Sequence, residues 1–326
     1  QAFLTMPHDS DTSTSSITSA NRVGFCGPNF FDASGLLPDS IAEEFITVLA
    51  SENSDYIAAF DEYKTGFFIT PRTVSQIFTI CARLRLPDDV KYQALDIFDR
   101  FMCNQTLLLY DLVAKSERSN EDKWRLWNKS MTILSRQLTL RMCTAIQIAS
   151  KMQSFHESLS KVDVRKALTA LGFPYTEDMI QKSELRILAS LDFNVQARRS
   201  PSQCVETYLS LLVRKHADLG GNIDAIYRYA LFTLDFVFLN RDAVYTEILR
   251  IVHGKNPVVI TSGRIRRVAQ DYCLLGIAAC LVGVICAHGQ LFSNQLLPDL
   301  AAIAILAESD VSDAISGILR IMAKTI

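Results

Sequence analysis

The segment 138–152 restricts the possible folds of this chain more than any other part of the sequence. Apolar residues recur there at steps of three and four, the period of an α-helix, and further apolar residues lie on the flanks. The recurring residues are Leu138, Met142, Ala145, Ala149 and Met152, and those on the flanks are Leu140, Ile146 and Ile148. A helix that is apolar around most of its circumference belongs inside a bundle of other helices. The sequence therefore predicts a buried central helix here, with Lys151 near its end reaching the surface or a partner.

A second segment of the same kind, 272–287, is apolar and uncharged. It is shorter than the roughly 20 residues needed to span a bilayer, so we predict a second core helix, within one helix over 265–287, and no membrane partner. Apolar residues also recur at helical spacing in 41–49, 71–84, 87–102, 161–171, 176–191, 201–213, 223–239, 242–253, 299–306 and a last stretch to 322. No segment has the alternation that is typical of strands. The predicted class is all-α, as two tandem bundles of about five helices, each around one buried helix.

The composition divides the chain into three parts. With 326 residues, of which 49% are hydrophobic and 21% charged, the chain is long enough for two modest folded domains. Residues 1–37 are rich in Ser, Thr and Asp and are predicted to form a disordered tail. A linker near 198–201 separates the predicted domains 38–198 and 199–326. Ser200-Pro201, beside two arginines, fits either a proline-directed phosphorylation site or a helix that begins at Pro201.

Residues 111–130 are rich in charged side chains around Trp124 and Trp127. We interpret them as an exposed, lengthened connection that ends in a helix. A tryptophan pair in a charged segment can anchor a partner protein, or it can cover the adjacent core, which is the commoner role of tryptophan. Both interpretations remain open at this point.

Charge and motifs argue against several classes of function. The formal net charge of −2 lacks the basic excess of a duplex-binding protein, so no direct contact with nucleic acid is expected. The eight cysteines include no Cys-x-x-Cys pair and no histidine spacing of a zinc site, which favours buried, reduced thiols. No glycine-rich phosphate loop or nucleophile elbow occurs. We therefore predict a protein that is not an enzyme and that binds no metal or cofactor.

Three short motifs, in order along the chain, resemble the cyclin box. They are Asp99-Arg100-Phe101-Met102, then Ile148-Ala149-Ser150-Lys151, then Glu184-Leu185-Arg186-Ile187-Leu188 closing with Leu191-Asp192-Phe193-Asn194. The resemblance implies an N-terminal cyclin box over 38–198 and a cyclin-like helical domain over 199–326. Within the family the chain is most similar to a divergent meiotic member. That similarity implies a non-catalytic regulator that promotes the maturation of meiotic crossovers at recombination sites on chromosomes in the nucleus.

The resemblance also implies residues that bind partners. Lys151 offers hydrogen-bond donors and Glu184 acceptors, which suits the end of a partner helix, and the matching residues of kinase-activating cyclins contact the kinase. Alternatively, Lys151 and Glu184 pair with each other at the surface. Some cyclins recruit substrates through a patch of side chains. In this chain only Arg72 resembles a residue of that patch. The expected partners are a cyclin-dependent kinase and meiotic recombination proteins. The alternative is a scaffold that binds no kinase. Such a scaffold would recruit recombination or clamp-loading proteins through Trp124 and Trp127 or through the second domain.

Overall fold

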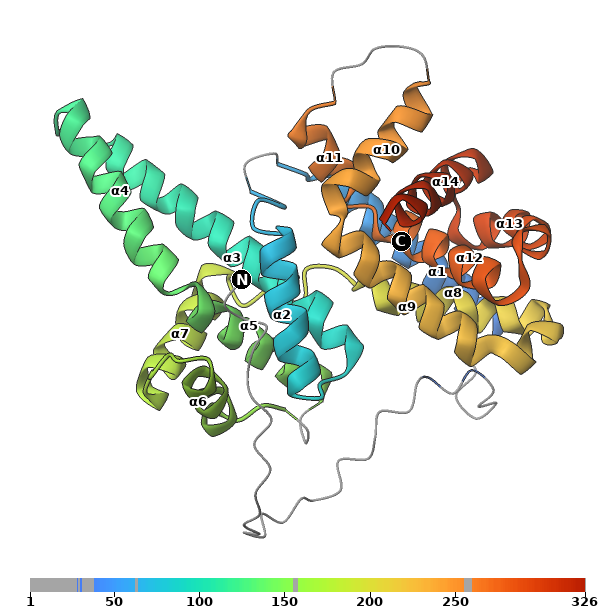
Figure 1. Cartoon of the computed structure of the whole chain (residues 1–326), viewed down its shortest axis with the longest axis horizontal. Helices are drawn as coiled ribbons and strands as arrows, with labels where there is room; N and C mark the ends of the chain where they lie inside the picture. The colour runs from blue at the N-terminus through green and yellow to red at the C-terminus, as the bar shows by residue number, and fades with distance from the viewer. Residues whose placement is uncertain are drawn as a thin grey trace, which may run out of the picture.

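The computed structural model describes residues 28, 30, 38–61, 64–154, 158–254 and 260–325 (Figure 1). These residues form fourteen α-helices and one 3-10 helix, and none of them lies in a strand. The predicted all-α class is confirmed. Nearly all of the predicted tail, 1–37, falls outside the described residues. Within the described ranges no helix alone is both long enough and apolar enough to cross a membrane. Helices α11 (Ser262–Val268) and α12 (Tyr272–His288), bent by 71° at the break between them, have that length and composition only when taken together.

A first bundle surrounds α5 (Leu138–Gln153). The helices around it are α2 (Pro71–Arg83), α3 (Asp88–Ala114), α6 (Lys161–Ala170) and α7 (Glu177–Ser190). Every residue of α5 from Leu140 to Ser150 is buried, so the predicted central helix is confirmed. Met152, which the spacing places with the buried residues, is 47% exposed, although the next residue, Gln153, donates hydrogen bonds to Asp89 and Gln93 of α3.

The predicted connection over 111–130 is wrong. Helix α3 continues to Ala114 and a second helix, α4 (Asn120–Arg136), runs back beside it. Figure 1 shows this helical pair, which we call the arm (residues 104–136), projecting from the body of the molecule. Buried Val113 and Leu134 lie within the arm. Lys123 Nζ donates to the carbonyl oxygen of Ala114 at 2.8 Å, which satisfies a backbone acceptor at the end of α3. Charged residues on the outer faces hid this pair from the sequence analysis.

A second bundle surrounds α12 (Tyr272–His288). The helices packed against it are α8 (Pro201–Lys215), α9 (Ile223–Leu239), α13 (Gln290–Ala304) and α14 (Glu308–Thr325). Nearly all of α12 from Tyr272 to Val284 is buried, which confirms the second central helix. A short 3-10 helix, Ala217–Asn222, joins α8 to α9. Helices α10 (Arg241–His253) and α11 (Ser262–Val268) are inserted between α9 and α12.

Two helix boundaries predicted for this half are wrong. The single helix expected over 265–287 is broken, because the Asp271 carboxylate accepts the backbone N–H of Leu274 at 2.8 Å and starts a new helix at a sharp angle. The helix expected over 299–306 begins earlier, at Gln290, and Pro298 lies inside it. Proline removes only one backbone N–H, and packing of α13 against α12 compensates for that loss.

The first helix, α1 (Asp39–Ala58), packs against α12 and α13 of the second bundle. Asn53 Nδ2 donates to Asp271 Oδ1 at 3.0 Å, and the backbone N–H of Tyr272 donates to Asn53 Oδ1 at 3.1 Å. Cys273 also contacts the Leu49 carbonyl. Residues near the start of the predicted domain 38–198 thus lie against the other half. The division at 198/199 stays a prediction.

Charged residues of α3 join the two halves. Asp96 accepts hydrogen bonds from Arg100, one turn later on α3, at 2.8 Å and from Arg198, in the predicted linker, at 3.1 Å. Burial alone would raise the pKa of Asp96, but the two guanidinium groups outweigh it and hold that pKa below its usual range. Arg198 also lies over the ring of Tyr272, with its guanidinium carbon 3.6 Å from the ring centroid.

A second group of contacts at this junction involves Asp89 and Lys91. Asp89 accepts hydrogen bonds from Ser200 and, at 2.6 Å, from Ser202. Ser200 is the N-cap of α8 and is 8% exposed, and Pro201 is the first helical residue. Lys91 Nζ lies 2.8 Å from Asp235 Oδ2 on α9. Because each of these contacts spans more than a hundred residues of sequence, the halves form one continuous core.

Candidate partner-binding surfaces

Lys151 and Glu184 form an ion pair between α5 and α7, with Lys151 Nζ 2.5 Å from Glu184 Oε1. The Lys151 side chain is 40% exposed and that of Glu184 15%. The structure therefore brings the two predicted residues together and shows that they pair with each other. Pairing does not exhaust either group, because an ammonium has three donors and a carboxylate has further lone pairs. The pair offers a partner one donor and one acceptor already held in a fixed geometry.

Apolar side chains lie beside each member of this pair. Met152 follows Lys151 and is 47% exposed, and Leu185 follows Glu184 and is 54% exposed. Exposed apolar groups around a partly desolvated polar pair are typical of a protein-binding surface. Neither residue was predicted as a contact: helical spacing placed Met152 in the core, and Leu185 was named only within the third motif.

Phe193, just beyond the end of α7, is 69% exposed. Asp192 and Phe193 have φ values of 49° and 60°, a left-handed conformation that costs side-chain-bearing residues free energy. Arg100 holds this turn: Nη1 donates to the carbonyl oxygen of Asn194 at 2.8 Å and Nη2 to that of Val195 at 2.7 Å. Because this turn holds its aromatic ring exposed, Phe193 is a further candidate contact residue. Its position in the segment that closes the third motif could have indicated this from the sequence.

On the arm, Trp124 and Trp127 have different environments. Trp124 is 64% exposed, whereas Trp127 is half-buried and its ring packs edge-on against Tyr110, with the ring centroids 6.1 Å apart. The core-covering interpretation is therefore wrong for Trp124, and Trp127 holds the two helices of the arm together. Leu108 and Leu112 on α3 are 53% and 61% exposed. Neither residue was predicted as exposed on a helix, because the predicted helix ended at 102 and Leu112 fell in the predicted connection 111–130.

Arg72 is an exposed residue in the first turn of α2, which begins after the cap residue Thr70. The five predicted contact residues thus fall on three separate parts of the molecule: α5 with α7, α4, and α2 (Figure 1). Only Lys151 and Glu184 are brought together.

Most cysteines in the described part of the chain are buried. Of the seven cysteines described there, six are buried and Cys286 is exposed. Burial raises the pKa of Cys81 to about 12 and that of Cys143 to about 12, so both thiols stay protonated at neutral pH. No group of three or more His, Cys, Asp or Glu side chains that could hold a metal occurs within the described residues.

No family model matches the chain. The chain is 26% identical to Cyclin N-terminal domain-containing protein 1 of Homo sapiens over 286 residues, which cover 86% of this chain and 85% of the human protein. It is 25% identical to the Mus musculus protein of the same name over 282 residues, which cover 86% of this chain and 82% of the mouse protein. The chain is thus similar over most of its length to proteins named for a cyclin N-terminal domain.

The resemblance to cyclins predicted from the sequence is thereby confirmed. Most residues of the three motifs have structural roles. Asp99 accepts the backbone N–H groups of Gly66 and Phe68, at 2.6 and 2.7 Å, and so fixes the approach to α2. Phe101 is fully buried, and Ser150 Oγ accepts the backbone N–H of Leu159 at 3.0 Å. The motif side chains left accessible to a partner include Lys151, Leu185 and Phe193.

Proposed function

We propose that this cyclin-like protein is a non-catalytic regulator that promotes meiotic crossover maturation by binding a cyclin-dependent kinase, recombination proteins, or both. The observation that carries the proposal is the surface formed by the Lys151–Glu184 pair with Met152 and Leu185 beside it. The meiotic role and the location, on meiotic chromosomes in the nucleus, come from the resemblance to Cyclin N-terminal domain-containing protein 1.

The chemistry of this surface suits the end of a helix in a kinase. The last carbonyl groups of a helix lack intrahelical donors, which the ammonium of Lys151 supplies, and the first N–H groups lack acceptors, which the carboxylate of Glu184 supplies. The exposed side chains of Met152 and Leu185 add apolar contact area next to these hydrogen bonds. Phe193 offers an aromatic anchor at the end of the same helix, α7.

The test is co-purification of a cyclin-dependent kinase from meiotic cells with the wild-type chain and with the double variant Lys151→Ala/Glu184→Ala. A matched control is Asp178→Ala/Lys182→Ala, which removes an exposed ion pair, with Lys182 Nζ 2.8 Å from Asp178 Oδ2, from the same helix α7. Circular dichroism first establishes that both variants fold like the wild type.

Loss of the kinase with the first variant alone is the expected result. Equal kinase recovery with all three proteins contradicts a role of the pair in kinase binding. Recovery of the same recombination proteins with all three, and of no kinase with any of them, favours the second candidate below.

The second candidate function is a cyclin-fold scaffold that binds no kinase and recruits recombination or clamp-loading proteins. The observation that favours it is the arm, which projects from the body and exposes Trp124, Leu108 and Leu112 (Figure 1). Large exposed apolar side chains on a projecting element are typical of interaction sites. The variant Trp124→Ala then loses recombination proteins in the same purification, while Lys129→Ala on the same helix retains them.

A further inference from the structure

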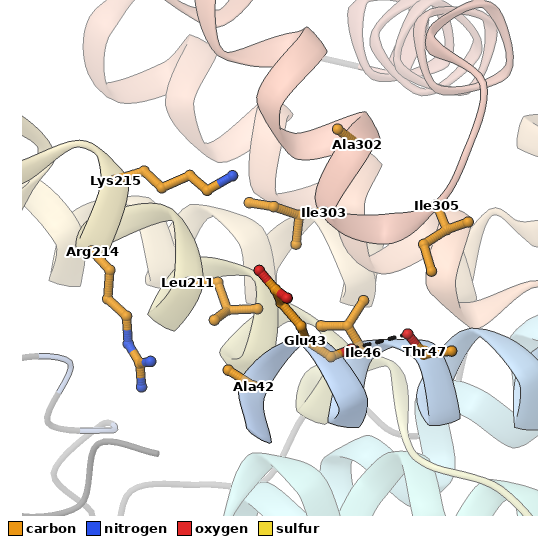
Figure 2. Close-up of a pocket in the computed structure, with 10 residues that line it drawn as sticks. All are labelled: Ala42, Glu43, Ile46, Thr47, Leu211, Arg214, Lys215, Ala302, Ile303 and Ile305. Atoms are coloured by element: carbon orange, nitrogen blue, oxygen red, sulfur yellow. Dashed lines mark hydrogen bonds between the residues drawn. The ribbon is translucent and has the colours of Figure 1, made fainter. Parts of the chain in front are cut away.

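A groove on the second half of the molecule lies between three helices, below α13, beside α8 and above α1 (Figure 2). Its volume is about 450 Å³, within the range of roughly 300–1,000 Å³ that is usual for ligand pockets. Aliphatic side chains from all three helices form its walls: Ala42 and Ile46 of α1, Leu211 of α8, and Ala302, Ile303 and Ile305 at the end of α13.

Charged side chains of opposite sign lie at the rim. Lys215, in the last turn of α8, extends over the groove toward Ile303, and Glu43 on α1 lies below it (Figure 2). Both side chains belong to exposed residues. The rim therefore favours an occupant that carries an acidic group opposite Lys215 and a basic group opposite Glu43.

Ile305 is in an unusual conformation at the mouth of this groove. It is the C-cap of α13 with φ 58° and ψ 42°, the left-handed region where glycine or asparagine is common and a β-branched residue costs about 1–2 kcal/mol. Its side chain is nevertheless 59% exposed, so burial in the free chain does not offset that cost. A strained and exposed isoleucine that lines a groove indicates a contact made with another molecule.

We propose that this groove is a docking site for an amphipathic helix of a partner protein, whose apolar face enters between α1, α8 and α13. An acidic edge of that helix pairs with Lys215, and a basic edge pairs with Glu43. The proposal is independent of the proposed function, because Lys151, Glu184 and the arm lie on other helices.

The walls of the groove decide in favour of a helical occupant. They consist of helices whose backbone groups are bonded internally, and no strand edge is present in the described residues to pair with an extended peptide. An occupant with unpaired backbone groups would leave them unsatisfied against aliphatic side chains. A helix satisfies its own backbone and presents apolar side chains at positions i, i+3, i+4 and i+7.

The test uses a fluorescent synthetic helical peptide with leucines at those positions, glutamates along one edge of the apolar face and lysines along the other. Fluorescence anisotropy measures its affinity for the full chain. Ile305→Asn removes a wall of the groove while suiting the left-handed conformation, so it folds at least as stably as the wild type and binds the peptide at least about tenfold more weakly. The control Leu291→Asn changes a residue on the same helix that is 84% exposed and does not line the groove, and it leaves the affinity unchanged.

A charge reversal tests the orientation of the occupant. A peptide with lysines on both edges binds the wild type more weakly than the first peptide does, and it regains affinity for Lys215→Glu. Absence of peptide binding, or equal binding by Ile305→Asn, overturns the proposal. Two other results also overturn it. If the peptide binds only after deletion of residues 1–27, the occupant of the groove is the chain's own N-terminal part. If light scattering shows a dimer that Ile305→Asn dissociates, the occupant is a second copy of the chain.

Discussion

The substitution Gly283→Ala tests the close packing of α12 against α9, the most extensive helix contact of the second bundle. A Cβ atom at position 283 would lie 2.6 Å from the carbonyl oxygen of Ile226 and 3.3 Å from the backbone nitrogen of Ala230, both on α9. These are backbone atoms, so no rotation of a side chain can relieve the contact. The two helices must separate until the first distance reaches the 3.4 Å at which ordinary contact begins.

Two effects of opposite sign determine the result. Alanine stabilises a helix interior by about 1 kcal/mol relative to glycine. Against this, overpacking in a well-packed core costs about 1–3 kcal/mol, and a separation of some tenths of an ångström also forfeits part of the dispersion attraction along both helices. We therefore expect a net loss of about 2 kcal/mol in the free energy of unfolding.

Denaturant titration followed by circular dichroism measures this loss, as a lower midpoint with an unchanged slope. The matched control is Gly221→Ala, where the added Cβ would have no heavy atom within 4 Å, and its midpoint stays at the wild-type value or rises slightly. The reasoning is refuted if Gly283→Ala is as stable as Gly221→Ala, because helix propensity would then outweigh the backbone contact.

Three further results are expected from urea titrations of single variants. Asp96→Asn lowers the free energy of unfolding by about 3 kcal/mol at pH 7, because it removes the carboxylate that the buried guanidinium of Arg198 contacts. Because the pKa of Asp96 is lowered in the folded chain, its carboxylate contributes to the free energy of unfolding at pH values above the unfolded pKa of about 3.9, and this contribution is lost as the pH falls further. A stability difference between Asp96→Asn and the wild type that persists undiminished at the lowest pH contradicts this. Ser200→Ala costs about 1 kcal/mol because the N-cap of α8 is lost. Ser200→Glu destabilises the chain more, because the new carboxylate also faces Asp89. Equal midpoints for the two variants would show that Asp89 does not lie near residue 200. Leu134→Ala lowers the free energy of unfolding by about 2–4 kcal/mol because Leu134 is buried. Trp124→Ala changes it by less than about 0.5 kcal/mol because Trp124 is exposed. A large loss of stability in Trp124→Ala would mean that the Trp124 ring is not exposed.

Features that depend on local pattern were predictable from the sequence. Thr70 and Thr176 accept hydrogen bonds from the backbone as N-caps of α2 and α7, and threonine is a residue type that favours this position. The pair of Lys151 and Glu184 was predicted together through the motifs, and the structure places the two side chains in contact. The interruption between α11 and α12 was missed, although Gln270-Asp271 precedes the apolar run and aspartate is a residue type that favours the N-cap position.

The sequence by itself determined that 138–152 and 272–287 are the central helices of two bundles. A helix that is apolar on every side must be surrounded, whatever its neighbours are, so composition is sufficient. Tertiary structure alone decided that Asp96 of α3 is buried and Asp89 half-buried, because their partners Arg198 and Ser200 lie more than a hundred residues away. It also decided that Met152 is exposed and that α1, α8 and α13 enclose a groove, since exposure of an apolar residue depends on where the neighbouring helices end, which the local sequence does not encode.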